Sequence, residues 1–301
     1  MMARRTFLGS VSATAVMPAF AQSAEAAATD THAHVFSRAL PLAERRRYSV
    51  DYDATPSAYL AMLAANGMAR GVLVQPSFLG FDNAYLTAAL ALSPRSLRGI
   101  AALDKDTPVS EMVRLADAGI AGIRLNLIGH ADPDLAATNW RRHLDHVAAL
   151  GWQIEVQCEA GRLPRLLPGL LDSGAPVVID HFGRPDTALG VDDPGFRHLL
   201  RSADAGRIYV KLSGAYRVGT ALADQAAPLL LKAFGPQRLL WGSDWPHTQF
   251  EAVADAASAR QALARWVPDP RDRAAILSQT PTALFGFDRP VRSSFSPETS
   301  E

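Results

Sequence analysis

Two histidines near the start of the chain, His32 and His34, stand two residues apart in a segment with the composition of a β-strand. Alternate side chains of a strand share one face, so both imidazoles, and Asp30 before them, are expected on the same side. Two imidazoles placed in this way can polarise a carbonyl group or hold a metal ion. His181 and Asp244 end two later strand-like segments. Together these residues predict a functional site.

Further polar side chains stand at the ends of strand-like segments. Between Gln153 and Glu159, the apolar residues Ile154, Val156 and Cys158 alternate with polar ones, which sends the two sets to opposite faces. Cys158 is therefore expected in the core and not as a nucleophile. Burying unpaired polar groups costs on the order of 1–3 kcal/mol each, so a cluster of them predicts an enzyme site. The polar set at the strand ends is His32, His34, Arg124, Gln157, Glu159, His181, Ser213 and Asp244.

Other histidines and cations lie outside this set. The helical pair His143 and His146 is interpreted as part of a solvated helix face. His247 either orients the site or caps a loop. Lys211 is either a satisfied buried ammonium or a contact for substrate. Residues 45–47, three arginines in a row, form a solvated charge run or else attract an anionic substrate.

Eight β-rich segments alternate with helical segments, with Gly or Pro at most of the junctions. This alternation predicts an α/β fold, a single (β/α)8 barrel of the TIM type over residues 28–287. In such barrels the active site lies at the carboxyl ends of the strands. The glycine-rich pattern of dinucleotide-binding folds does not occur. The strand-like segments end near Val35, Gln75, Leu103, Leu127, Cys158, His181, Gly214 and Asp244.

Composition narrows the possible functions. The chain has 301 residues, 48% of them hydrophobic, with 30 basic and 30 acidic side chains. A chain of this length and apolar content can bury a large core, and its zero formal net charge makes nucleic acid an unexpected partner. The single Cys excludes an internal disulfide and a Cys-rich zinc site. No apolar run reaches the roughly 20 residues that span a bilayer, so no membrane insertion is expected.

The first 21 residues resemble an export signal. Arg4 and Arg5 precede a short apolar run that ends in small residues around Ala21. The paired arginines are typical of twin-arginine export, which predicts a periplasmic protein. The polar residues 288–301 are expected to form a loose tail. Oligomeric state is left open.

Four motifs, in this order along the chain, resemble the amidohydrolase superfamily, and within it the branch that contains 2-pyrone-4,6-dicarboxylate lactonase. The resemblance covers about residues 30–287. It implies that Asp244 is the general base that activates water, and that His32, His34 and His181 polarise a lactone carbonyl. The motifs are Asp30-Thr31-His32-Ala33-His34-Val35-Phe36, Asp180-His181-Phe182-Gly183-Arg184-Pro185, Lys211-Leu212-Ser213-Gly214 and Leu240-Trp241-Gly242-Ser243-Asp244-Trp245-Pro246-His247.

The same resemblance implies substrate contacts from Tyr48, Ser77, Arg124 and Arg217. Two further anchors of the family differ, because His130 stands in place of an Arg and Gln157 in place of a Tyr. A neutral His binds a carboxylate less well than the two-pronged guanidinium of Arg. Arg124 and Arg217 still favour an anionic ligand. We expect a small anionic lactone as substrate, such as a carboxylated or sulfonated pyrone, a muconolactone or a sugar-acid lactone.

Two questions of chemistry stay open. Many amidohydrolases hold two metals bridged by a carboxylated Lys on the fourth strand, but residues 122–126 contain no Lys, which excludes that site. The enzyme needs either no cofactor or one divalent cation, Zn or Mn, on His32, His34, His181 and Asp244. The alternatives to a lactonase are a metal-dependent decarboxylase or amide hydrolase of the same superfamily, and a non-catalytic periplasmic binder of organic acids.

Overall fold

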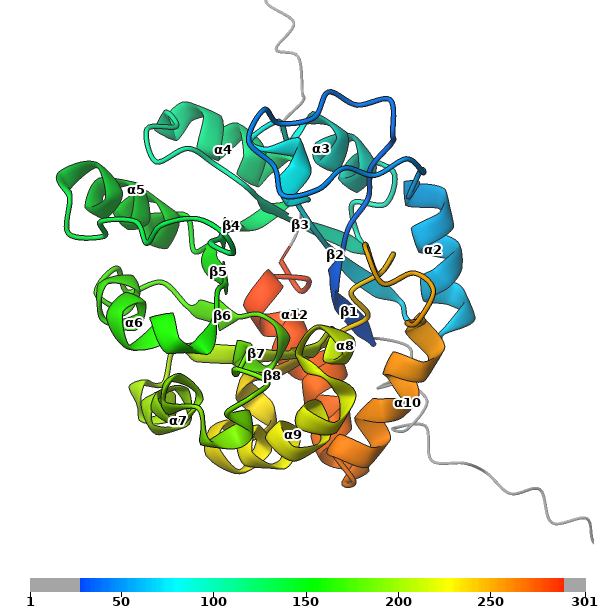
Figure 1. Cartoon of the computed structure of the whole chain (residues 1–301). Helices are drawn as coiled ribbons and strands as arrows, with labels where there is room; N and C mark the ends of the chain where they lie inside the picture. The colour runs from blue at the N-terminus through cyan, green and yellow to red at the C-terminus, as the bar shows by residue number, and fades with distance from the viewer. Residues whose placement is uncertain (1–27, 290–301) are drawn as a thin grey trace, which may run out of the picture.

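Eight parallel strands are hydrogen-bonded in sequence order, as the alternation predicts, and helices connect them around the outside (Figure 1). The computed structural model describes residues 28–289, so the predicted export signal and residues 290–301 of the predicted tail lie outside it. The strands are β1 (Thr29–Ala33), β2 (Arg70–Val74), β3 (Leu97–Ala101), β4 (Ile120–Asn126), β5 (Gln153–Gln157), β6 (Val177–Ile179), β7 (Ile208–Ser213) and β8 (Leu239–Gly242).

The helices begin with the signals that the sequence supplies. Thr55 caps one of them by accepting the backbone N–H of Ala58 at 3.2 Å, and Asp193 caps another by accepting the N–H of Gly195 at 2.6 Å. Pro follows each of these caps, where its missing N–H costs nothing. The helices are α2 (Pro56–Ala65), α3 (Ala84–Ala91), α4 (Val109–Asp117), α5 (Thr138–Ala149), α6 (Leu163–Leu171), α7 (Pro194–Arg201), α8 (Ala215–Val218), α9 (Thr220–Phe234), α10 (Ala256–Trp266), α11 (Pro270–Ala274) and α12 (Thr280–Phe285).

The first and last strands meet and close the barrel. The backbone N–H of Asp244 donates to the carbonyl of His32 at 2.8 Å, and the N–H of His34 donates to the carbonyl of Trp245 at 2.8 Å. Gly242 allows this approach, since a Cβ there would lie 2.6 Å from the Cβ of His32. The closure therefore brings the predicted general base beside the two predicted histidines.

The strands divide their side chains between the barrel interior and the helices. Ile154, Val156 and Cys158 are buried in the outer core against the helices, as predicted. Glu155 and Gln157 are buried on the other face, inside the barrel. Glu159 departs from the prediction, because the strand has already ended and its side chain is exposed.

A plug of C-terminal residues fills the end of the barrel opposite the predicted site. Phe285 and Phe287 join a cluster with inward-facing Val72, Ile100 and Leu240 (Figure 1, α12 at the centre). Arginines from β2 and β3 stack on Phe287, with guanidinium carbons 5.1 and 4.9 Å from the ring centroid. The polar chemistry is thus confined to the opposite, carboxyl-terminal end of the strands.

Two assignments made from the sequence are wrong. His143 is only 2% exposed and its ring lies against Trp140, whereas the prediction put it on a solvated helix face. Asp30 does not join His32 at the site, because a register shift interrupts the alternation in β1. Its carboxylate accepts hydrogen bonds from the hydroxyl groups of Tyr59 and Ser243 and so fastens β1 to α2 and β8.

Within residues 28–289, no helix has both the length and the apolar content that crossing a membrane requires.

Candidate active site

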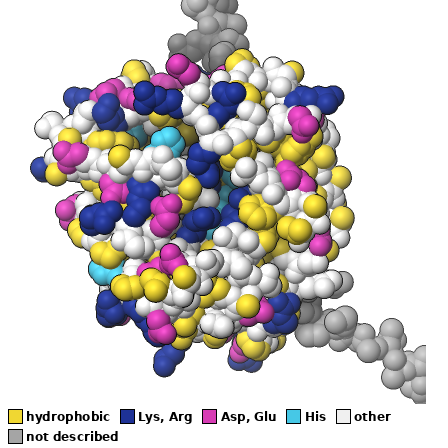
Figure 2. Space-filling view, viewed as in Figure 1, with side chains coloured by type: hydrophobic (Ala, Val, Ile, Leu, Met, Phe, Trp, Pro, Cys, Tyr) yellow, Lys and Arg dark blue, Asp and Glu magenta, His cyan; other side chains and the backbone are white. Residues whose placement is uncertain are grey.

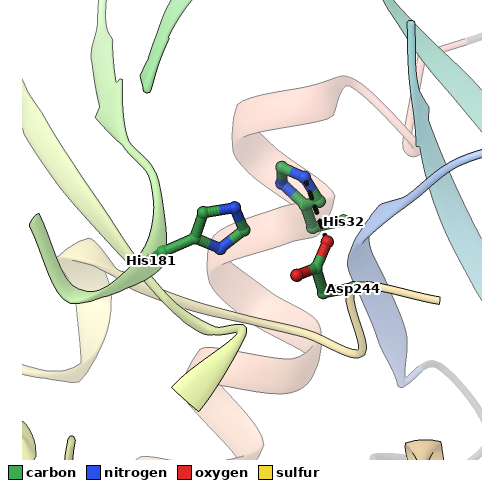
Figure 3. A group of neighbouring side chains, drawn as sticks. All are labelled: His32, His181 and Asp244. Atoms are coloured by element: carbon green, nitrogen blue, oxygen red, sulfur yellow. Dashed lines mark ion pairs between the residues drawn. The ribbon is translucent and has the colours of Figure 1, made fainter. Parts of the chain in front are cut away.

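Three strand ends bring His32, His181 and Asp244 together at the mouth of the barrel (Figure 3). His32 comes from β1, His181 follows β6, and Asp244 lies two residues beyond β8. Their side chains are almost completely buried, with exposed fractions of 0–1%. Segments that lie up to about 210 residues apart in the chain thus converge because parallel strands end at one edge.

His32 rests on a network of buried charges. Its Nδ1 lies 3.1 Å from Nζ of Lys211, which also forms an ion pair with Glu155 and lies 3.7 Å from Asp180. The ammonium favours a lone pair on Nδ1, whereas the carboxylate oxygens of Asp180 and Glu155, 3.3 and 3.4 Å from the same nitrogen, favour a proton there. Burial keeps the pKa of His32 well below its usual range, so the ring is neutral. With its proton on Nε2, His32 presents an N–H to the site.

His34 has the opposite hydrogen-bonding pattern. Its Nδ1 lies 2.7 Å from the carbonyl oxygen of Val74, which can only accept, so the proton resides on Nδ1. Burial, and then the nearby charge of Arg124, lower the pKa of His34 to about 3. Its Nε2 consequently carries a lone pair and lies 3.8 Å from Oδ1 of Asp244. With the proton of His32 on Nε2, the two histidines of the pair are a donor and an acceptor.

Asp244 has one engaged and one available oxygen. Its Oδ2 accepts from Nε of Arg217 at 2.5 Å and from the hydroxyl of Tyr216 at 2.7 Å. Its Oδ1 has no hydrogen-bond donor among the described residues and lies 3.8 Å from Nε2 of His32. Burial raises the pKa of Asp244, but the Arg217 charge and the imidazoles outweigh burial and hold it well below its usual range. Oδ1 is therefore an ionised base directed at the histidines.

His181 is fixed by the segment that follows β7. Its Nδ1 lies 2.9 Å from Oγ of Ser213, and burial lowers its pKa to about 4. Gly214 has a φ of 56°, and a Cβ there would lie 2.8 Å from Oδ2 of Asp244 and 2.9 Å from Nδ1 of His181. Only Gly tolerates both this conformation and this closeness. His181 and Asp244 themselves have φ of 50° and 60°, so the backbone is strained on both sides of the site.

The arginines make the catalytic pocket basic. Arg124 donates to Oε1 of Gln157 at 2.8 Å, and Arg47 and Arg217 also line the pocket. Figure 2 shows Lys and Arg side chains around the hollow in the barrel mouth. The pocket suits an anionic ligand. Its other lining residues are His34, Tyr48, Pro76, Ser77, Asn126, His181 and Asp244.

The structure therefore brings the predicted site residues together, apart from Asp30, Glu159 and His130. His130 is exposed and lines a neighbouring cavity instead of the catalytic pocket. Arg47, the last of the three consecutive arginines, lines the pocket. This position fits the interpretation that the arginine run attracts an anionic substrate. Lys211 is the satisfied buried ammonium, beneath His32. Each residue's catalytic or binding role stays a prediction.

The sequence did not single out Tyr216. Its hydroxyl donates to Asp244, and its ring packs against His247, whose Nδ1 lies 3.5 Å from the same hydroxyl. The backbone N–H of His247 also donates to the carbonyl of Asp244 at 2.8 Å within the loop, so both roles considered for His247 stay predictions. The available signal was position: Tyr216 directly precedes Arg217, one turn after the end of β7.

A divalent cation would need lone pairs from this set. The donor atoms of His32, His181 and Asp244 lie within 4.8 Å of one another, a spacing that one ion can bridge. A histidine that binds metal donates its other ring N–H to an acceptor, and Oδ1 of Asp180 lies 3.3 Å from Nδ1 of His32, beside the Lys211 ammonium at 3.1 Å. A second group, His32 with Glu155 and Asp180, surrounds the Lys211 ammonium. Nε2 of His32 and Oδ1 of Asp244 have no hydrogen-bond partner among the described residues, so the set would fit one divalent cation with His32 protonated at Nδ1.

Lactone hydrolases are among the known proteins that this chain resembles. A 4-sulfomuconolactone hydrolase of Rhizobium radiobacter is 34% identical over 275 residues, which cover 86% of this chain and 90% of the relative. A 2-pyrone-4,6-dicarboxylate hydrolase of Comamonas testosteroni is 31% identical over 238 residues, or 74% and 77% of the two chains.

A crystal structure from Acinetobacter baumannii has a TM-score of 0.84 at 39% identity and covers 86% of this chain and 99% of its own. It is described as a probable 2-pyrone-4,6-dicarboxylic acid hydrolase with citric acid bound. The amidohydrolase family model matches residues 29–287, nearly all of the described chain. This protein belongs to the amidohydrolase family.

Proposed function

We propose that this protein hydrolyses a small anionic lactone, with Asp244 as the base that activates water. The chain is an enzyme that acts on cyclic esters, as its named relatives do. The observation that carries the mechanism is the ionised Oδ1 of Asp244, which lies 3.8 Å from Nε2 of both His32 and His34. These separations leave room for an oxygen atom of a reactant between the groups.

The opposite tautomers of the two histidines assign them different tasks. A water molecule donates one hydrogen to Oδ1 of Asp244 and the other to the lone pair on Nε2 of His34, which aims its oxygen at the lactone carbonyl. The N–H of His32 donates to the carbonyl oxygen and stabilises the negative charge that develops there. This division refines the expectation that all three histidines act alike.

The reaction balances without a covalent intermediate. The water oxygen bonds to the carbonyl carbon while its proton moves to Asp244. The tetrahedral intermediate then collapses, the ring C–O bond breaks, and the departing ring oxygen takes the proton from Asp244. The product is a hydroxy acid or its keto tautomer, and Asp244 regains its charge.

The arginines support the choice of an anionic substrate. Arg47, Arg124 and Arg217 all line the catalytic pocket, and the Nε of Arg124 has no hydrogen-bond acceptor among the described residues. A guanidinium held in this way favours a carboxylate or sulfonate on the lactone.

The test is ring opening of carboxylated and sulfonated lactones, followed by absorbance, with wild type and Asp244→Asn. Loss of the base should lower kcat by about 10²–10⁴-fold. Asp117→Asn, which removes an exposed carboxylate from α4, is the matched control and should keep full activity. An Asp244→Asn enzyme as active as wild type would refute the mechanism.

The same assay separates the alternatives. A metal-dependent decarboxylase or amide hydrolase loses activity with a chelator and recovers it with Zn or Mn, whereas the lactonase proposed here does not respond. A periplasmic binder holds lactones without opening them.

We also propose that the chain is exported to the periplasm, on the strength of Arg4 and Arg5 and the apolar run behind them. Fractionation of cells that produce wild type or an Arg4→Lys, Arg5→Lys double variant tests this, and export of both forms alike would contradict it.

A further inference from the structure

A large cavity adjoins the catalytic pocket, and the two share three lining residues. Ser77, Arg124 and Asn126 contact both spaces. The catalytic pocket has a volume of about 20 Å³, whereas the adjoining cavity has about 680 Å³. A space of 20 Å³ holds about one water molecule, so a lactone ring whose carbonyl reaches Asp244 must extend past these shared residues.

The far walls of the adjoining cavity are mainly apolar. They include Leu79, Phe81, Leu103 and Trp140, from the segments after β2 and β3 and from α5. Phe81 is 61% exposed, so its ring offers apolar surface to a ligand in the cavity. His130, in place of the Arg that the family resemblance implies, also lines this cavity. Arg45, Asp104 and Lys105 line the cavity as well, so its charged groups lie among a largely apolar lining.

We propose that the preferred substrate is a lactone with one anionic group and an apolar arm, either aryl or alkyl, that occupies this cavity. The inference rests on the proposed lactonase function and specifies its substrate class. Arg124, at the junction of the two spaces, holds the anionic group, and the arm lies against Trp140 and Phe81. The volume suffices, since a cavity of about 150 Å³ already holds a benzene ring.

Three monocarboxylated pyrones that differ only in one ring substituent (hydrogen, propyl or phenyl) test the proposal. Each methylene that leaves water should raise kcat/KM by about fourfold, so the propyl and phenyl compounds should be strongly preferred to the hydrogen compound. One such set of compounds is made for each free ring carbon, so that in one set the substituent points into the cavity.

Two variants place the preference in this cavity. Phe81→Lys and Trp140→Gln should each reduce the ratio of kcat/KM between the phenyl and hydrogen compounds, because each puts a polar group where the arm lies. Leu92→Lys is the control, since Leu92 is 65% exposed on α3 and lines neither space. It should leave the ratio unchanged.

The outcomes are distinguishable. Opening of the hydrogen compound with no gain from any arm, or a gain that both cavity variants retain, overturns the cavity proposal and leaves the lactonase function standing. Failure to open any of the compounds overturns the lactonase function and the cavity proposal with it. A preference for the arm that either cavity variant abolishes supports both.

Discussion

Burial raises the pKa of Asp244, and the charge of Arg217 lowers that pKa more than any other neighbour does. Arg217 therefore contributes most to keeping Asp244 ionised in acid. In Arg217→Gln the pKa of Asp244 should rise, so protonation inactivates the base at a higher pH. The acid limb of the kcat/KM profile should therefore move upward in pH relative to wild type. Arg165→Gln, which removes an exposed arginine paired with Asp132, is the control and should leave the limb in place.

An acid limb that does not move in Arg217→Gln would mean that Asp244 is not the group that titrates in the free enzyme. A fall in activity with no change in the shape of the profile would assign Arg217 to substrate binding alone.

The two histidine tautomers can be observed directly. Long-range nitrogen–hydrogen correlation spectra of 15N-histidine-labelled protein at neutral pH should show His34 protonated at Nδ1, as the Val74 carbonyl requires, and His32 at Nε2, as the proposed mechanism requires. His32→Asn and His34→Asn variants assign the signals. Protonation of His32 at Nδ1 would contradict the division of tasks and would restore a lone pair that a metal ion needs.

At the scale of elements, the turn after β7 sets the distance between His181 and Asp244. Gly214→Ala adds a Cβ that would contact both, so kcat should fall tenfold or more, together with about 1–2 kcal/mol of stability from the positive φ. Gly206→Ala is the matched control, because Gly206 also has a positive φ, 77°, but nothing lies within 4 Å of its Cβ position. It should lose stability and retain kcat, as measured by urea unfolding and steady-state kinetics.

Equal loss of kcat in the two glycine variants would show that backbone strain, and not the contact with the catalytic side chains, decides the effect.

The sequence predicted the strands, and the faces on which their side chains lie, better than it predicted the details of the site. The period-two alternation of β5 separates Ile154 and Val156 from Glu155 and Gln157 correctly, because both faces of the strand are buried in chemically different surroundings. Helix α6 has two prolines, at its start and inside it, and these weaken the helical signal of its sequence. The role of Tyr216 depends on how a short helix turns toward the site, which periodicity does not encode.

The register of β1 and the burial of His143 are also features that sequence periodicity does not reveal. Asp30 has the spacing of a site residue, but a local irregularity in pairing gives it a structural role, and only the paired strand reveals that irregularity. His143 lies on a helix rich in polar residues, yet it faces the barrel side of that helix.

At the scale of the whole molecule, stability and catalysis occupy opposite ends of the barrel. Phe285→Ala should lower the free energy of unfolding by about 3–5 kcal/mol, because Phe285 is only 2% exposed inside the C-terminal plug. Its kcat should stay close to that of wild type, since the plug lies far from the strand ends that hold the site. Urea unfolding and the lactone assay measure the two quantities.

Val253→Ala is the control for the plug, because Val253 is 74% exposed and should change stability by less than about 0.5 kcal/mol. A Phe285→Ala protein that keeps its stability but loses activity would contradict this separation of the two ends.

The closure of β1 on β8 has a consequence for the order in which the protein matures. A ribosome makes the chain from its N-terminus, so His32 and His34 emerge more than two hundred residues before Asp244. Until β8 leaves the ribosome, His32 has no carboxylate from Asp244, and the floor of the barrel is complete only when Phe287 follows. The nascent chain therefore carries both histidines from an early stage but acquires Asp244, the proposed base, only when the segment after β8 has been made.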